Sequence, residues 1–414
     1  MRRVDGDIDR PAQPRSAHDD PCARSTRRPR DLRIDVNNRT KPASYPPKQE
    51  HSVPWFWPLS AAIEMEEAGM KLFQQNLKYA AEVQKISAPP PLKWATANRV
   101  LLDLDTMRLR DFTAATLKAS RAPVLVFAPY AGHASTIADY STGQSLVETL
   151  LASGLPRVLA TDWKAATHEM KDFDIDKYLA EINVVVDDLG GDVHLVGLCQ
   201  GGWMAAMVAC RFPGKVRSLV LAGSPIDTDA GDGAIKRMAH RLPMSFYEEL
   251  VAAGGGRMLG RFMLAGWKNM HPSEAYFEKY LDLYRHIEDK SYIARTEQFE
   301  DWYENAIDLP GRYYLQAIDG LFKHNRFARG EFVGLGRTLS LKDVTVPVYL
   351  LAGESDDITT REQVFGAERL LGTPRARIEK KLVPGGHIGL FMGTNTLRDT
   401  WPQIARWIGT HDVA

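Results

Sequence analysis

The chain has 414 residues, with 52 basic and 52 acidic side chains, so its formal net charge at pH 7 is +0. Apolar residues make up 44% of it, which is ordinary for a globular protein and excludes a wholly disordered one. Nucleic-acid binding needs a basic excess, which is missing, and no apolar run approaches the roughly 20 residues that cross a bilayer. We therefore predict neither a nucleic-acid partner nor a membrane span.

The cysteines are sparse and odd in number: Cys22, Cys199 and Cys210. They form no CxxC pair and no cluster with metal-ligand spacing. Such usage is unlike a disulfide scaffold and indicates a reducing compartment. The charged N-terminus also lacks the apolar segment of a secretory signal. We therefore expect a cytoplasmic protein.

The first part of the chain differs in character from the rest. Residues 1–50 are rich in arginine, aspartate and proline, which predicts a disordered tail, with a basic targeting or granule-binding arm as the alternative. Residues 51–95 contain a predicted amphipathic helix over 63–81, where apolar side chains recur at spacings of three and four. This helix either packs on the catalytic domain or docks on a hydrophobic granule or a second subunit.

From residue 96 onward the sequence alternates between strand and helix patterns. The alternation covers 96–225 and 342–414 and predicts an α/β fold with a mostly parallel sheet and helices on both faces. The aromatic-rich stretch 226–341 interrupts it and is interpreted as an inserted helical cap. The predicted strands are 123–127, 157–160, 193–196, 216–221, 347–351 and 378–383, and the predicted helices are 176–188, 200–211 and 397–408.

The strongest chemical signal is the segment 197–202, which reads GLCQGG. It follows a strand and precedes a helix, as does the nucleophile of a G-x-S-x-G elbow, here with cysteine in place of serine. Glycines must flank the nucleophile, because side chains there would collide with the adjacent strand or helix. The helix N-terminus favours a thiolate and a developing oxyanion. We predict Cys199 as the nucleophile.

Such a nucleophile needs a base and an acid that orients the base. In this kind of fold they follow the nucleophile in the order acid, then base. Asp356 lies three residues after a strand-ending glycine, with Glu354 and Asp357 as neighbouring competitors. His387 lies in a glycine-containing loop after the next strand, where a histidine is poorly placed to fill a core. We predict Asp356 as the acid and His387 as the base.

Further site residues are expected around the nucleophile. The backbone N–H groups of Gln200 and of Tyr130 or Ala131 are candidates for the oxyanion hole. His133, in the same loop, either contacts substrate or braces the loop. Trp203 either forms a wall of the acyl pocket or packs under the helix.

Two other residues receive structural interpretations. His194 lies in a predicted strand and is expected to be a core residue with its hydrogen bonds satisfied. Cys210 lies in the middle of a predicted helix and is expected to be a small buried hydrophobe. No pair of histidines stands at i, i+4 beside a carboxylate, so no zinc site is predicted.

Taken together, the motifs resemble those of the intracellular polyhydroxyalkanoate depolymerases, which are relatives of the polyhydroxyalkanoate synthases within the α/β-hydrolase superfamily. The resemblance covers about residues 95–410 and implies an α/β-hydrolase fold. The family's Cys–Asp–His triad corresponds to Cys199, Asp356 and His387. The matching segments are 128–133 with Thr136, 161–163, 173–178, 223–228, 314–316, 328–330 and 353–358.

The resemblance implies hydrolysis of a polyhydroxyalkanoate such as poly(3-hydroxybutyrate), or of its oligomers, with no metal or organic cofactor. The expected partner is the polyester, at the surface of a storage granule, and a homo-oligomer remains open. Gly201-Gly202 is closer to the synthases' elbow, which leaves synthase-type acyl transfer as an alternative, whereas the cap lacks synthase-like sequences. A second alternative is a non-catalytic granule-associated protein with a vestigial hydrolase fold.

Overall fold

A computed structural model describes residues 92–113, 122–270, 286 and 289–412. The predicted tail over 1–50 and the predicted helix over 63–81 lie outside these residues. No helix in the described part of the chain is both long enough and apolar enough to span a bilayer.

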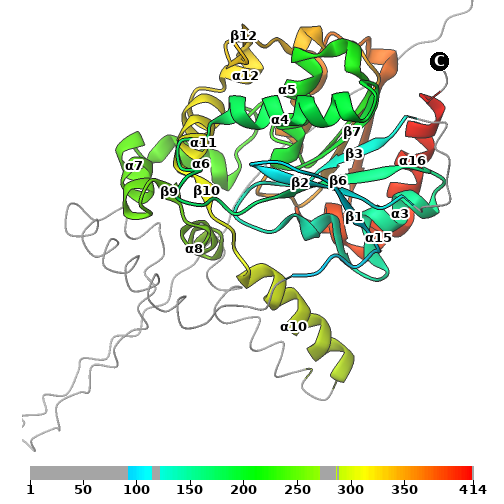
Figure 1. Ribbon diagram of the computed structural model, residues 1–414, viewed down its shortest axis with the longest axis horizontal. Coiled ribbons are helices and arrows are strands. Elements are labelled where there is room, and N and C mark those ends of the chain that lie inside the picture. The colour runs from blue at the N-terminus through cyan, green and yellow to red at the C-terminus, as the bar shows by residue number, and fades with distance from the viewer. Residues whose placement is uncertain (1–91, 114–121, 271–285, 287–288, 413–414) are drawn as a thin grey trace, which may run out of the picture. The chain divides into compact units, whose positions relative to one another are not determined.

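The core of the described chain is an eight-stranded sheet with the order β1-β2-β6-β3-β7-β8-β13-β14 (Figure 1). The six strands from β6 to β14 run parallel, and β2 is antiparallel to both β1 and β6. The predicted mostly parallel sheet is therefore confirmed. The strands are β1 (Arg99–Asp103), β2 (Met107–Asp111), β3 (Val124–Phe127), β6 (Val158–Trp163), β7 (Val193–Leu198), β8 (Val216–Ala222), β13 (Val348–Gly353) and β14 (Ile378–Val383).

Burial explains why some strands were predictable from the sequence and the first two were not. Every residue of β3, β7 and β13 is buried, so these strands read as continuous apolar runs. The first two strands are absent from the prediction. In β2 buried residues alternate with half-buried arginines, and β1 at the edge is partly exposed along its length. Short strands of this kind carry a weak apolar signal.

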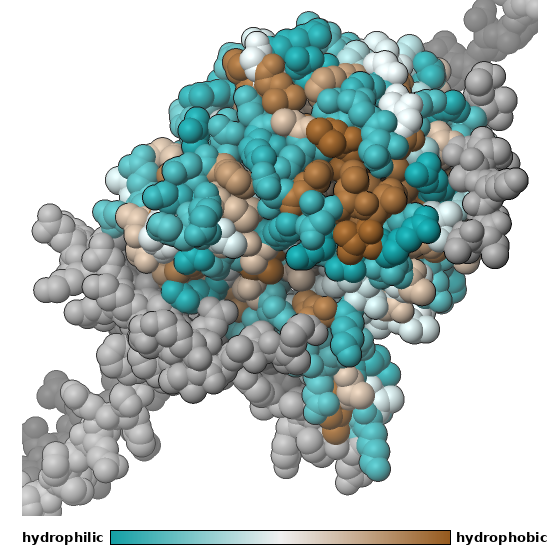
Figure 2. All heavy atoms as spheres, viewed as in Figure 1, coloured by the Kyte–Doolittle hydropathy of each residue, from teal (hydrophilic) through white to brown (hydrophobic). Residues whose placement is uncertain are grey.

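The sheet separates two apolar cores, and helices cover both of its faces. Residues of α4 and α5 belong to one core, and residues of α3, α15 and α16 belong to the other. Figure 2 shows mostly hydrophilic side chains on the near face, with an apolar area where Figure 1 labels β2 and β6. The predicted helix over 397–408 is two helices, separated at Thr400. The bounds are α3 (Leu146–Ala152), α4 (Ile175–Asp188), α5 (Gln200–Arg211), α13 (Arg361–Phe365), α14 (Gly389–Met392), α15 (Thr394–Asp399) and α16 (Trp401–Thr410).

The predicted cap region lies between β8 and β13 and is largely helical in its described part. The division of the chain into domains stays a prediction. The cap helices are α6 (Ala234–Arg241), α7 (Met244–Ala253), α8 (Gly260–Met270), α10 (Lys290–Glu304), α11 (Gly311–Ala317), the π-helical η4 (Ile318–Lys323) and α12 (Arg326–Arg329). Two small antiparallel pairs accompany them: β9 (Arg257–Met258) with β10 (Leu309–Pro310), and β11 (Val333–Gly334) with β12 (Arg337–Thr338).

Candidate active site

Cys199 lies at the turn between β7 and α5, the position predicted for the nucleophile. Its backbone has φ 51° and ψ −120°, which makes it a non-glycine residue at positive φ. Residues in such sparsely populated regions cost about 1–3 kcal/mol and persist where the surroundings hold them. The turn presents the thiol to a cavity that Cys199 helps to line. The local geometry is that of a strained strand-to-helix elbow.

The glycines around the turn are required by close approaches of the backbone. A Cβ on Gly197 would lie 2.3 Å from Cα of Gly202. A Cβ on Gly201 would lie 2.2 Å from the carbonyl oxygen of Phe127, and one on Gly202 would lie 1.8 Å from Oγ of Ser224. Real Cβ atoms do not come so close to other atoms. The three glycines of GLCQGG therefore lie where the backbone at the turn between β7 and α5 leaves no room for a side chain.

Asp356 and His387 form a hydrogen-bonded pair at the same edge of the sheet. Oδ2 of Asp356 lies 2.7 Å from Nδ1 of His387. The other oxygen, Oδ1, accepts hydrogen bonds from the N–H groups of Ile358 at 3.1 Å and Thr359 at 2.8 Å. An ionised carboxylate only accepts, so the Nδ1 atom of His387 carries the proton in this pair. Its Nε2 atom is then the one available for proton transfer.

The choice among three adjacent carboxylates follows from the path of the loop after β13. Asp356 is buried, whereas Glu354 and Asp357 are exposed. It is the carboxylate of Asp356 that lies against Nδ1 of His387. The geometry thus agrees with the acid that the sequence favoured, and its catalytic role stays a prediction.

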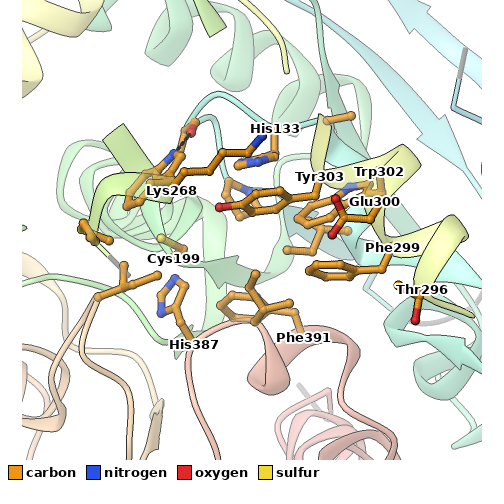
Figure 3. Close-up of a pocket in the computed structure, with 18 of the residues that line it drawn as sticks. His133, Cys199, Lys268, Thr296, Phe299, Glu300, Trp302, Tyr303, His387 and Phe391 are labelled. Atoms are coloured by element: carbon orange, nitrogen blue, oxygen red, sulfur yellow. Dashed lines mark hydrogen bonds between the residues drawn. The ribbon is translucent and has the colours of Figure 1, made fainter. Parts of the chain in front are cut away.

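The charges around His387 favour its protonated form. Burial alone lowers the pKa of the imidazole, but the negative charges of Cys199 and Asp356, with hydrogen bonds to both, outweigh burial and raise this pKa to about 10. Figure 3 shows the thiol of Cys199 directed toward the ring of His387. Phe391 contacts this ring edge-on, with the ring centroids 5.2 Å apart. The arrangement is suited to a thiolate–imidazolium pair.

Cys199 and His387 open onto a cavity of about 540 Å³. It lies between the end of the sheet and the cap helices α8 and α10 (Figure 3). Charged side chains among the lining residues are few. Apart from His387, the main lining side chains are the aromatic residues Trp267, Tyr292, Phe299, Trp302, Tyr303 and Phe391 and the charged residues Lys268, Arg295 and Glu300. A cavity of this composition suits an apolar acyl group.

The loop after β3 brings one of the two predicted oxyanion amides to the cavity. Ala131 lines the cavity, and its N–H donates to no backbone carbonyl in the described part of the chain. Tyr130 instead turns its side chain into the core, where its hydroxyl donates to the carbonyl of Lys164 at 3.0 Å. Gln200 is the first residue of α5. Ala131 and not Tyr130 therefore belongs to the cavity lining, and an oxyanion hole at the amides of Gln200 and of Ala131 or Tyr130 stays a prediction.

His133 lines the same cavity as the nucleophile. Its ring stacks on Trp302 and Tyr303, with centroids 5.0 Å away in both cases. Burial, together with the positive charge of Lys268, lowers the pKa of His133 to about 4, so the ring is neutral near pH 7. Its Nε2 atom is buried and has no hydrogen-bond partner among the described residues. Both predicted roles, contact with substrate and bracing of the loop, are compatible with this position.

Backbone contacts join this loop to the segment after α10. The N–H of Ile307 donates to the carbonyl of Gly132 at 2.8 Å, and His133 forms a β-bridge with Ala306. The loop that carries Ala131 is thus attached to the end of the helix that covers the cavity.

The prediction that Trp203 lines the acyl pocket is wrong. Trp203 is 1% exposed and is absent from the cavity lining. It packs under α5 against Tyr313, with ring centroids 6.1 Å apart. The alternative prediction of packing is the one observed, because the side chain after Gly202 points back toward the core and away from the cavity.

The cap residues that line the cavity could not be predicted from the sequence. The aromatic richness of the cap was visible, but nothing in it distinguished residues that line the cavity from those that fill the core. Cys210 is buried, as expected, and both described cysteines are free. No group of three or more histidine, cysteine or acidic side chains that could hold a metal ion occurs in the described residues.

Comparisons with known proteins identify relatives in sequence. The family model described as "Protein of unknown function (DUF3141)" matches residues 102–371. A "Poly(3-hydroxyalkanoate) polymerase subunit PhaC" from Haloferax mediterranei is 27% identical over 323 residues, which cover 75% of this chain and 63% of the relative. The protein of the same name from Allochromatium vinosum is 26% identical and is matched over 65% of this chain and 76% of its own length.

The chain thus spans less than two thirds of the Haloferax relative. Among solved structures, the monoacylglycerol lipase of Paleococcus ferrophilus aligns with a TM-score of 0.47 and 16% identity, covering 74% of this chain and 99% of the lipase.

Proposed function

The chain belongs to the DUF3141 family and is an α/β hydrolase related to the polyhydroxyalkanoate polymerases, and from its site we propose that it cleaves polyhydroxyalkanoate esters through a thioester on Cys199. The substrate would be poly(3-hydroxybutyrate), a similar polyester, or its oligomers. The observation that carries the proposal is a free thiol at a strained elbow, in a largely apolar cavity that it shares with a carboxylate-bound histidine. The proposal includes a cytoplasmic location and association with polymer granules.

The first half of the reaction forms the acyl-enzyme. The Cys199 thiolate attacks the ester carbonyl, and the N–H groups of Gln200 and Ala131 stabilise the negative oxygen. As the tetrahedral intermediate collapses, the C–O bond breaks and Nε2 of His387 gives its proton to the leaving alkoxide. Asp356 holds the ring in the tautomer with a proton on Nδ1 and stabilises the imidazolium.

The second half releases the acid. His387, now neutral, takes a proton from water while the oxygen of that water attacks the thioester carbonyl. The C–S bond breaks, a 3-hydroxyacid is released, and the thiolate and imidazolium are restored. Atoms and charge balance with water as the sole co-substrate.

A second candidate uses the same thioester with a different acceptor. Cys199 would take the acyl group from a hydroxyacyl-coenzyme A thioester, with coenzyme A leaving as the thiol, and transfer of that group to the hydroxyl of another hydroxyacyl unit would extend a polyester instead of shortening it. Two observations favour this candidate: the names of the polymerase relatives and the Gly201-Gly202 pair at the elbow. In both candidates Cys199, Asp356 and His387 have the same roles in forming the acyl-enzyme, and the leaving group differs.

The two candidates are separated by two assays on the purified full chain. We expect release of 3-hydroxybutyrate from amorphous poly(3-hydroxybutyrate), and loss of this activity in Cys199→Ala and after treatment with iodoacetamide. Cys210→Ala is the matched control, because this cysteine is buried in the core. Release of free coenzyme A from 3-hydroxybutyryl-coenzyme A, without hydrolysis of polymer, would instead support acyl transfer.

Two other outcomes would overturn the proposal. Equal hydrolysis by the parent and Cys199→Ala would exclude the thioester mechanism. Absence of both activities in the parent protein would favour the non-catalytic granule protein.

A further inference from the structure

A second, smaller cavity lies in the cap beside the catalytic one. Its volume is about 70 Å³, and none of its lining side chains carries a charge. Methionines and aromatic residues dominate the lining, among them Met238, Met258, Met263, Phe246 and Tyr314. Flexible, polarizable methionine side chains fill irregular gaps and adapt to apolar ligands. The chemistry of this cavity therefore matches a run of methylene groups.

The two cavities share part of their walls. Trp267 and Met270, near the end of α8, line both. Met270 is an unbranched side chain with several rotatable bonds, whereas an indole is rigid and large. Trp267 is therefore the main barrier between the catalytic cavity and the methionine-lined one.

The indole of Trp267 is held in place from the side of the active site. Its Nε1–H donates to the carbonyl oxygen of Ala131 at 3.2 Å. The next residue, Gly132, has φ +90° and approaches α8 so closely that a Cβ there would lie 3.0 Å from Cβ of Met263. The loop after β3 and α8 thus contact each other at successive turns of the helix, and these contacts keep Trp267 beside the cavity that Cys199 lines.

We propose that the methionine-lined cavity is an acyl-chain subsite which Trp267 closes, and that Trp267 thereby limits the length of acyl group that Cys199 accepts. The inference deepens the proposed function, on which its catalytic test rests. In the parent protein the indole confines the acyl group to the catalytic cavity and keeps it out of the methionine-lined one. Removal of the indole joins the two cavities and admits longer chains.

The first test uses p-nitrophenyl esters from butanoate to dodecanoate as probes. Trp267→Ala should raise the ratio of kcat/KM for octanoate to that for butanoate by about tenfold or more, since each methylene group in an apolar pocket changes discrimination by about that factor. Trp267→Phe is the matched control. It keeps a ring in the wall but loses the N–H donor to Ala131, so it should lower kcat for all esters without changing the ratio.

A second variant tests whether a gain in Trp267→Ala comes from joining the two cavities or from a general loosening of the cap. Ala265 lines the methionine-lined cavity and is not part of the catalytic one. Ala265→Leu introduced into Trp267→Ala fills the added space, and the octanoate preference should return toward that of the parent. Retention of the gain in this double variant would overturn the proposal, because the longer chain would then occupy some other space.

A third measurement does not depend on turnover. Alkyl methanethiosulfonates modify thiolates: the cysteine sulfur attacks the divalent sulfur, a disulfide forms and methanesulfinate leaves. The rate for the octyl reagent relative to the ethyl reagent, with the mass mapped to Cys199, should be low in the parent and rise at least severalfold in Trp267→Ala. An unchanged ratio in both assays would refute the subsite. A parent that cleaves no ester but shows this rise would refute the proposed function and support the subsite.

Discussion

Two buried histidines lie at opposite ends of the sheet, each close to a carboxylate and to a hydroxyl or thiol. At the carboxyl end, His387 is bonded to Asp356 and faces Cys199. At the other end of β7, Nδ1 of His194 lies 2.7 Å from Oγ of Ser218, and its Nε2 lies 3.5 Å from Oδ1 of Asp412. Each group therefore contains the residue types of a catalytic triad. The proposed chemistry is assigned only to the group with Cys199.

The difference lies in charge and access. Burial lowers the pKa of His194, which keeps the ring neutral, whereas the charges near His387 raise its pKa to about 10. His387 also lines the 540 Å³ cavity, while His194 is 1% exposed. The predicted core position of His194 is observed, but of its two ring nitrogens only Nδ1 has a hydrogen-bond partner among the described residues. A histidine with neighbouring polar groups is therefore a poor indicator of catalysis. The end with His387 differs from the other in two ways: the histidine lines a cavity, and negative charges lie next to its ring.

The largest expected effect comes from replacing each histidine with glutamine. His387→Gln removes the general acid and base and should lower kcat for ester cleavage by at least about a thousandfold. His194→Gln should leave kcat within about threefold, but lower the free energy of unfolding by about 1–3 kcal/mol because Ser218 loses its buried partner. Initial rates and urea denaturation measure the two quantities. Similar losses of kcat in both variants would remove the distinction between the two ends.

The carboxylates allow a second comparison. Asp356→Asn places an amide beside Nδ1 of His387 and favours the tautomer with its proton on Nε2, so kcat should fall by about 10³–10⁴. Asp412→Asn should change kcat by less than about threefold, since it lies at the far end of the sheet. Steady-state kinetics of both variants test this. A residual rate within tenfold of the parent in Asp356→Asn would mean that Glu354 or Asp357 supplies the acid.

A smaller effect is expected from two glycines at the two ends of α5. Gly202→Ala would bring a Cβ within 1.8 Å of Oγ of Ser224, and the shift needed should cost about 1–3 kcal/mol of unfolding free energy. A Cβ on Gly214, just after α5, would meet no described atom within 4 Å, so Gly214→Ala should stay within about 0.5 kcal/mol of the parent. Denaturant unfolding of both variants gives the comparison. Equal stabilities would show that the elbow relaxes without cost.

The pH dependence of stability separates the two histidines once more. The raised pKa of His387 contributes stability that is complete below about pH 6.5 and is lost as pH rises toward 10. The lowered pKa of His194 acts in the opposite sense, and stability falls as pH drops below about 6.5. His387→Gln should therefore flatten the alkaline side of a plot of unfolding free energy against pH, and His194→Gln the acid side. An unchanged slope on either side would contradict the assignment for that histidine.

The central strands and the nucleophile turn were predictable because their signals are local. β3, β7 and β13 are buried on both sides and read as apolar runs, and GLCQGG places glycines where the backbone leaves no room. Asp356 and His387 were predictable from the chain order nucleophile, acid, base and from their places in the loops after two late strands. Alternation with arginine concealed β2, because two of its five residues are arginines, which are typical of a solvated segment.

The rest of the site could not be predicted from the sequence, because it depends on packing between segments that are far apart in the chain. Nothing local to Trp203 tells which way its side chain turns once α5 has begun, and the structure buries it against Tyr313. The contributions of Trp267 and Trp302 to the cavity depend on how α8 and α10 lie over the sheet. That arrangement is decided by contacts between segments more than a hundred residues apart, such as the hydrogen bond from Trp267 to Ala131.

The β-bridge between His133 and Ala306 bears on which part of a polyester chain the protein can attack. Any outward movement of α10 would pull on the loop that holds Ala131, because the bridge and the hydrogen bond from Ile307 to Gly132 join that loop to the segment after the helix. We therefore expect polyester to be cleaved faster where it enters the cavity without displacing α10, and the sizes of the products released from polymer, measured over time, test this.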